Sequence, residues 1–113
     1  MRSSSRAMAE SSFSAPVFAA LGDQTRLQLV ARLCNDGPMS IARLTAGTHV
    51  TRQAITKHLR VMEQAGLLRS TRQGRASVWQ LEARRLEEAL RYVEMISKQW
   101  DAALSRLRRL VED

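Results

Sequence analysis

The segment from Thr51 to Ala65 carries two chemically different stripes, and this pattern constrains the fold more than any other feature of the chain. One stripe recurs at helical spacing and is apolar except for a histidine; it consists of Ala54, Ile55, His58, Leu59 and Met62. The opposite stripe is polar and basic and consists of Arg52, Gln53, Thr56, Lys57 and Arg60. Because residues three and four apart share one face of an α-helix, we expect a helix with one buried face and one face free to bind a polyanion.

The polar stripe contains residue types that read base edges in DNA. Arg can pair with the two acceptors of guanine, Gln can pair with adenine, Thr offers a hydroxyl and a methyl group, and Lys can bind phosphate or guanine. A helix face that is merely solvated more often alternates Glu with Lys in ion pairs four residues apart. Here Glu63 is the only acid between Thr51 and Arg75. The stripe therefore favours nucleic-acid binding.

The distribution of charge supports the same interpretation. Residues 51–75 carry six basic side chains and one acidic side chain, a balance of +5, out of a net charge of +7 for the chain, whereas residues 82–113 carry seven of each sign. Such a concentrated basic region is typical of nucleic-acid binding, whereas a membrane-surface helix would need a bulkier apolar face. Aromatic residues make up only 4% of the chain, which leaves little for stacking on unpaired bases. Double-stranded DNA is therefore the favoured ligand.

The first half of the chain is expected to form a tail and three short helices. Residues 1–12 are rich in serine and are expected to be disordered; their arginines also suggest an organelle transit peptide, which is the less favoured alternative. Residues 15–21 are apolar and end at a glycine, after which Asp23 can cap a second helix. A third helix is expected after Ser40. In the second helix the predicted inward stripe is Leu27, Val30, Ala31 and Cys34.

The helix that begins near Thr51 is expected to end at Gly66 and to lead into a basic β-hairpin. Leu67–Leu68 begins one strand, Gln73–Gly74 supplies the turn, and residues 76–81 run back as the second strand. Three arginines without a neighbouring acid favour a wing that contacts phosphates over a charged sheet edge that only aids solubility. The predicted DNA-binding residues are Thr51, Arg52, Gln53, Thr56, Lys57, Arg60, Arg69, Arg72 and Arg75.

The C-terminal segment, about residues 83–112, predicts a long helix with an apolar seam at steps of three and four, broken only at Ser97. A domain of residues 13–113 is too small to bury such a seam alone, so pairing with a second copy is favoured. The alternative is a helix folded back onto its own core. The predicted interface residues in this helix are Leu86, Leu90, Val93, Ile96, Trp100, Leu104, Leu107 and Val111.

Cysteine usage and hydropathy predict a cytoplasmic location. Cys34 is the only cysteine, so no internal disulfide can form and a reducing compartment is favoured. No apolar run approaches the length of a membrane span, and the N-terminus lacks the apolar core of a secretory signal, so no membrane partner is expected. Cys34 is expected to act as a small buried apolar residue, since a lone thiol has no resolving partner in its own subunit.

Several linked motifs resemble the ArsR/SmtB family of bacterial winged helix-turn-helix repressors. They are Phe18–Leu27, Arg52–Leu59, Glu63–Leu68 and Gly74–Arg75, and together they extend over roughly Val17–Leu81. The resemblance implies a mainly α fold with a β-hairpin, and a homodimer joined through its first and last helices that binds a pseudo-palindromic operator. It places one recognition helix of each subunit in the major groove. It also adds three residues of the first helix to the interface, namely Val17, Phe18 and Leu21.

The chain departs from the metal-sensing members that it resembles. Many of those use paired cysteines on the helix before the recognition helix or histidines on the last helix, and both are missing here. Cys34, His49 and His58 fall in three different elements, so we expect neither a metal site nor a cofactor. His49 is expected in a turn, where histidine tolerates a left-handed backbone. For His58 we favour a hydrogen-bonded or phosphate-facing role over that of a ligand.

The sequence thus predicts a DNA-binding transcriptional repressor that is not an enzyme. A winged helix that binds only proteins would lack the acid-free basic stripe. An enzyme would need a nucleophile with a base, or paired carboxylates, in one pocket, and no such group of residues stands out. A small-molecule or protein effector is left open as a further partner.

Overall fold

Three helices of the chain begin directly after a residue whose side chain caps them. The computed structural model describes residues 15–112, so the predicted disordered tail at residues 1–12 lies outside the described residues. The side chains of Asp23, Ser40 and Thr51 accept hydrogen bonds from the backbone N–H three residues later, at 3.0, 3.3 and 3.2 Å. Such bonds satisfy N–H groups that have no partner within the helix. The three predicted caps are confirmed.

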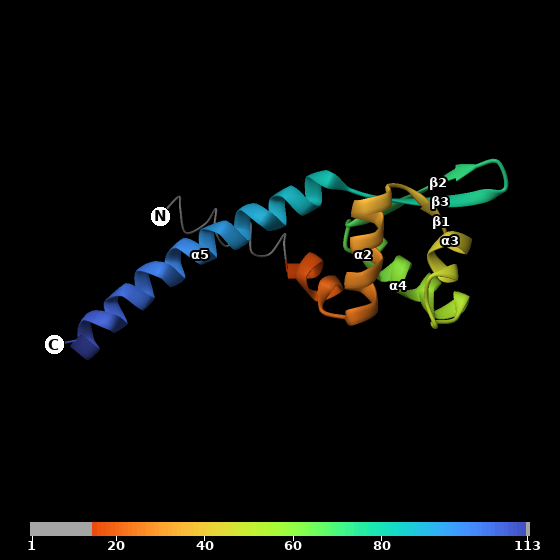
Figure 1. The fold of residues 1–113 in the computed structure, drawn as a ribbon. Coiled ribbons are helices and arrows are strands. Elements are labelled where there is room, and N and C mark those ends of the chain that lie inside the picture. The colour runs from red at the N-terminus through yellow and green to blue at the C-terminus, as the bar shows by residue number, and fades with distance from the viewer. Residues whose placement is uncertain (1–14, 113) are drawn as a thin grey trace.

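The described elements form a helical domain with a small sheet, from which one long helix extends (Figure 1). Residues 15–21 are helical. The elements that follow are α2 (Gln24–Asp36), β1 (Met39–Ser40), α3 (Ile41–Ala46), α4 (Arg52–Gln64), β2 (Leu68–Gln73), β3 (Ala76–Leu81) and α5 (Ala83–Glu112). None of the helices within residues 15–112 has the length and apolar character needed to cross a membrane.

The core lies where α2, α3 and α4 meet the sheet. The apolar stripe of α4 is confirmed, because Ile55, Leu59 and Met62 are fully buried. Their burial leaves the polar stripe of the same helix on the surface. The other buried apolar side chains in these elements are Leu29, Leu33, Met39, Leu44, Leu68 and Trp79, and Leu67, between α4 and β2, is buried as well.

The predicted inward stripe of α2 is wrong except at Val30, which is half-buried and packs against the core. Leu29 and Leu33 are the buried residues of this helix, whereas Leu27 is 52% exposed and Ala31 and Cys34 lie on the surface. Both sets recur at helical spacing, so periodicity alone does not choose between them. The Leu29–Leu33 pair removes more apolar area from water than Ala31 and Cys34 could. Cys34 is therefore an exposed thiol and not a core residue.

The predicted hairpin is present, and a third strand joins it. The strand order is β1-β3-β2 and both pairings are antiparallel, with Leu68 opposite Leu81 and Met39 opposite Trp79. The two-residue loop at 74–75 lies one position later than the predicted turn. Gly74 has a φ of 63°, which a glycine adopts without steric cost at the first position of a type II′ turn. His49 does not need such a backbone, because no described residue other than glycine has a positive φ.

The first half of the long helix α5 packs against the domain. Ala89 is buried, and the ring of Tyr92 lies 5.9 Å from that of Phe18 in the first helical segment. Beyond this contact the helix continues away from the domain, which gives the molecule a length of 65 Å against widths of 32 and 21 Å (Figure 1). The helix does not fold back onto its own core.

Candidate nucleic-acid interface

The polar face of α4 forms an open hollow on the surface of the domain. Arg52, Gln53, Thr56 and Lys57 line it together. Arg52, Gln53 and Lys57 are exposed, and Thr56 is half-buried. The Thr56 hydroxyl donates to the carbonyl of Arg52 at 2.8 Å, so its lone pairs and its methyl group remain for a ligand. Arg60, one turn further along, is also exposed.

The acid on α4 lies beyond this hollow. Glu63 accepts a hydrogen bond from the Ser70 hydroxyl at 3.3 Å, which directs its carboxylate toward β2. Four donor-bearing side chains therefore occupy the hollow without a carboxylate among its lining residues. Such a surface attracts anions and presents hydrogen-bonding groups that can distinguish base edges.

The three arginines of the hairpin do not act as one cluster. Arg72 and Arg75 are exposed near the hairpin tip. Arg69 lies near the hairpin base, where its Nε is 2.9 Å from a carboxylate oxygen of Glu82. With the amide of Gln80 turned so that its oxygen faces Arg69, that oxygen also accepts from the guanidinium. Because side chains alternate between the faces of a strand, Arg69 and Arg72 also point to opposite faces. The predicted cluster of three is therefore wrong for Arg69.

An arginine that the sequence did not single out holds α3 in place. The guanidinium of Arg32, on α2, donates to the carbonyls of Leu44 at 2.8 Å and Arg43 at 3.0 Å. These carbonyls lie in the last turn of α3, where backbone acceptors have no partner within the helix. The same guanidinium covers Gly47, where a Cβ atom would lie 2.8 Å from its nitrogen. Arg32 thus fixes both α3 and the start of the turn that leads to α4.

Replacing Arg32 with Met is expected to lower the free energy of unfolding by about 1–3 kcal/mol, because the carbonyls of α3 lose a charged donor while the apolar stem is retained. Urea denaturation measures the change. Arg43→Ala is the matched control, since the Arg43 side chain is exposed and only its backbone takes part; its effect is expected to stay within about 0.5 kcal/mol. Equal stability of the two variants would show that water replaces the Arg32 contacts.

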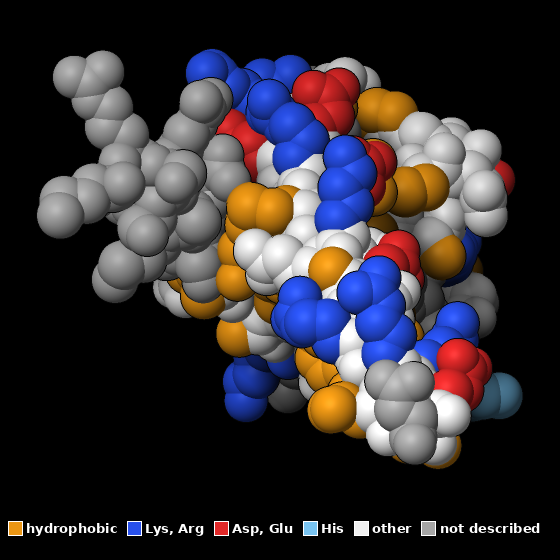
Figure 2. Space-filling model, turned by 90° about the vertical axis from the view of Figure 1, so that its left-hand side faces the viewer, with side chains coloured by type: hydrophobic (Ala, Val, Ile, Leu, Met, Phe, Trp, Pro, Cys, Tyr) orange, Lys and Arg blue, Asp and Glu red, His pale blue; other side chains and the backbone are white. Residues whose placement is uncertain are grey.

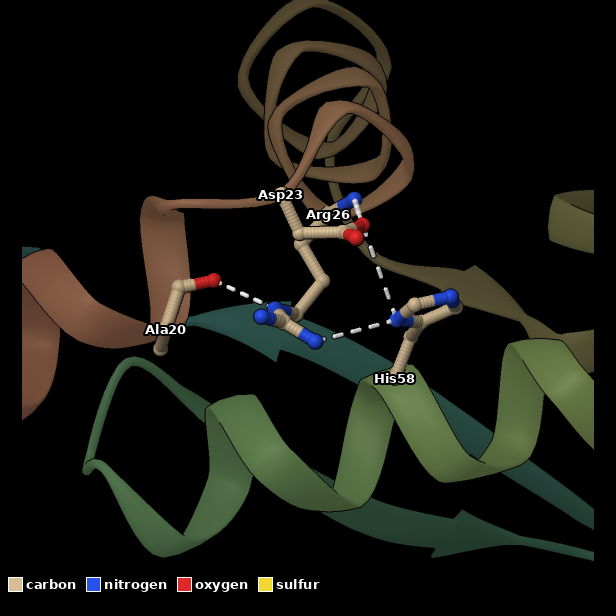
Figure 3. A network of polar contacts seen from close by, with 4 residues as sticks. All are labelled: Ala20, Asp23, Arg26 and His58. Carbon is tan, nitrogen blue, oxygen red and sulfur yellow. Dashed lines mark hydrogen bonds and ion pairs between the residues drawn. The ribbon is translucent and has the colours of Figure 1, made fainter.

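The inward face of α4 carries one polar group, His58, which contacts the start of α2 (Figure 3). Its Nδ1 lies 3.2 Å from a guanidinium nitrogen of Arg26 and 3.8 Å from a carboxylate oxygen of Asp23. The Nε of Arg26 donates in addition to the carbonyl of Ala20. The hydrogen bond from the Arg26 backbone N–H is the main cause that lowers the pKa of Asp23, and the nearby His58 ring and Arg26 guanidinium lower it further. His58 is therefore a hydrogen-bonded residue at the α2–α4 contact.

The other residues that could bind metals lie apart. His49 is exposed in the turn before α4, and Cys34 is exposed near the end of α2. Within residues 15–112, no three His, Cys, Asp or Glu side chains gather in a way that could hold a metal ion.

The apolar seam of α5 lies on the surface of the single chain. Figure 2, which views the molecule from the side toward which α5 extends, shows apolar side chains exposed between basic and acidic ones. Leu86 and Ile96 are half-buried, as are Phe18 and Leu21 of the first helical segment. The exposed members of the seam are Leu90, Val93, Trp100, Leu104, Leu107 and Val111, at 44–86% exposure, and Leu110, which the sequence interpretation missed, is 76% exposed.

Val17 does not share this exposure. Only 1% of it is accessible, and it belongs to the buried core of its own subunit. It therefore offers no surface to a partner, contrary to the interface role expected for it. Its neighbour Phe18 remains partly accessible, because its ring packs at the edge of the core, against Tyr92.

Comparison with known proteins agrees with this geometry. Residues 21–71 match the helix-turn-helix domain family HTH_20. The uncharacterized HTH-type transcriptional regulator YuzN of Bacillus subtilis is 40% identical over 68 residues, which cover 55% of this chain and 74% of that protein. An ArsR-like transcriptional regulator from Rhodococcus sp. RHA1 superposes with a TM-score of 0.73 at 32% identity, covering 88% of this chain and 92% of that one. The chain belongs to the ArsR family of helix-turn-helix transcriptional regulators.

A second similar structure shows the same fold at lower identity. It is the homodimeric winged helix-turn-helix DNA-binding domain Mb0332 of Mycobacterium bovis, with a TM-score of 0.65, 19% identity, and coverage of 83% of this chain and 86% of that one. The predicted fold class, a mainly helical winged helix-turn-helix, is confirmed. In this ArsR-family chain α3 and α4 form the helix-turn-helix and β2 and β3 form the wing.

Proposed function

We propose that this ArsR-family regulator is a repressor that binds a pseudo-palindromic operator in double-stranded DNA as a homodimer. The observation that carries the proposal is the hollow lined by Arg52, Gln53, Thr56 and Lys57 on the surface of the second helix of a helix-turn-helix. In this motif the second helix enters the major groove, where base edges present distinct patterns of donors and acceptors.

The residues around the hollow have different roles in DNA recognition. Gln53, Arg52 and Lys57 have side chains long enough to reach base edges, and the methyl group of Thr56 can contact thymine. Thr51 uses its hydroxyl to cap α4, so its part in binding is to keep the N–H groups of the first turn directed at a phosphate. Arg60 and the wing tip bind phosphates on either side of the groove.

The homodimer is supported by the exposed seam of α5. Isolated apolar side chains on a surface are ordinary, but a row of them along one helix face, broken here only at Ser97, marks an interaction site. A second copy offers the same row, and the homodimeric M. bovis domain has the same fold. A two-fold dimer presents two recognition helices to successive major grooves. A repressor bound there prevents other proteins from binding the promoter.

Selection, from a random pool, of the DNA duplexes that bind this protein tests this function. Sequencing of the retained DNA is expected to yield an inverted repeat whose half-sites lie about 10 base pairs apart, one turn of the double helix. A gel shift with the selected duplex, competed by scrambled DNA, then measures specificity. Retention of DNA without any enriched motif would overturn sequence-specific binding.

Arg72→Ala is expected to weaken binding to all duplexes alike and to flatten the slope of log affinity against log salt concentration by about one unit, because one phosphate is no longer neutralised. Affinities measured at several salt concentrations give this slope. Arg69→Ala is the matched comparison in the same strand and is expected to change the slope less, because Glu82 already neutralises that guanidinium. A larger change in this slope for Arg69→Ala than for Arg72→Ala would show that Arg69, and not Arg72, is the phosphate contact of the wing.

A further inference from the structure

The recognition helix is fixed to the rest of the domain by two kinds of contact. Its apolar side packs through Ile55, Leu59 and Met62, which are fully buried. Apolar packing is roughly proportional to area and has no preferred direction. The contact of His58 with Arg26 is directional, since hydrogen bonds weaken steeply when donor and acceptor are misaligned. It is therefore suited to fixing the orientation of α4.

Arg26 connects three elements through two different nitrogens. Its Nε donates to the carbonyl of Ala20 at the end of the first helical segment, and a terminal nitrogen faces His58 Nδ1 at 3.2 Å (Figure 3). Its own backbone N–H donates to Asp23, which caps α2. His58 immediately follows Lys57, which lines the hollow on the other face of α4. A rotation of α4 that displaced the ring would displace the reading side chains as well.

The state of the imidazole decides whether this contact is attractive. Neutral His58 accepts from Arg26 through Nδ1 when its proton is on Nε2. A second proton on Nδ1 removes the acceptor and places a cation beside the guanidinium, while Asp23 at 3.8 Å becomes the attractive neighbour. Asp23 and Arg26 are the charged groups that contact the ring within the described part of the chain. Protonation therefore exchanges the partner of His58.

We propose that Arg26 and His58 are positioning residues for DNA binding: neutral His58, held by Arg26, keeps α4 in the orientation that reads DNA, and proton uptake at His58 opposes binding. The proposal rests on the proposed DNA-binding function. DNA and the proton then compete, so each weakens the binding of the other.

The test compares wild type with His58→Asn, each over pH 7.5 to 5.5, with the selected duplex. Asparagine keeps an acceptor close to the position of Nδ1, has a helix propensity like that of histidine, and does not titrate. The affinity of the wild type for the duplex is expected to fall about five- to tenfold from pH 7.5 to 5.5, a range in which histidines take up protons. The His58→Asn variant is expected to match the wild type at pH 7.5 and to lack this fall. The pKa of Asp23 is lowered from an ordinary value of 3.8, so Asp23 stays charged throughout and its cap is lost only under stronger acid.

Two further variants distinguish the positioning role of Arg26 and His58 from a general effect of charge on DNA binding. His49 is exposed in the turn before α4, on a different element from His58, so His49→Asn is expected to leave the fall in place. Arg26→Lys keeps the charge, but it replaces by a single nitrogen the two separate nitrogens that reach Ala20 and His58. It is expected to weaken binding about five- to tenfold at pH 7.5 and to flatten the pH profile. Circular dichroism at each pH records the folded fraction.

The outcomes are distinct. Parallel pH profiles for folded wild type and His58→Asn would overturn the positioning proposal, as would an Arg26→Lys variant that binds like wild type. Failure of all four proteins to bind any selected duplex at pH 7.5 would instead overturn the proposed function. A fall in affinity that is present in wild type and His49→Asn, absent from His58→Asn and flattened in Arg26→Lys supports the proposal.

Discussion

Replacing Trp100 with Asp is expected to convert the homodimer into monomers and to abolish tight operator binding. The Trp100 side chain is 65% exposed in the single chain and lies on the seam of α5. Removing a large aromatic side chain that a partner encloses costs about 3–5 kcal/mol, and the variant would in addition bury a carboxylate. Because each monomer presents only one recognition helix, operator affinity falls when dimerisation is lost. Sedimentation velocity at micromolar concentration and a gel shift measure the two effects.

Ala102→Asp is the matched control for this prediction. Ala102 is exposed on the same turn of α5 but points away from the seam, so the same charge there is expected to leave the dimer intact. A wild-type protein that sediments as a monomer at micromolar concentration would contradict the dimer itself. Dissociation by both variants would point to general destabilisation of α5 instead.

The parts of the fold that depend on nearby residues could be predicted from the sequence. A cap at Thr51 acts three residues ahead, and the two stripes of α4 follow from a period of 3.6, so both could be predicted. The buried face of α2 could not, because Leu29 and Leu33 compete with another stripe of the same period. The choice depends on what packs against the helix, which local periodicity does not contain.

Contacts between distant residues were beyond the sequence interpretation for a different reason. Arg26 and His58 are 32 positions apart, and nothing in their spacing pairs them. Arg69 and Arg72 are neighbours in sequence, yet strand alternation and the register that sets Arg69 opposite Gln80 give them different surroundings. For the candidate site, the sequence could therefore supply the reading face of α4, whereas the roles of the arginines around it depend on the three-dimensional arrangement of the elements.

Replacing Gln53 with Ala is expected to relax base preference at one position in each half-site and to reduce operator affinity by about 1–3 kcal/mol for each bidentate pair removed. Gln53 is exposed in the first turn of α4 and lines the hollow, where its amide can pair with adenine. Repeating the selection from random duplexes with the variant measures the preference at every position. Gln64→Ala is the matched control, since Gln64 is exposed at the far end of the same helix and lies outside the hollow. If the two variants select the operator of the wild type with equal affinity, the polar face of α4 does not read bases, and recognition must come from the wing or from the shape of the DNA.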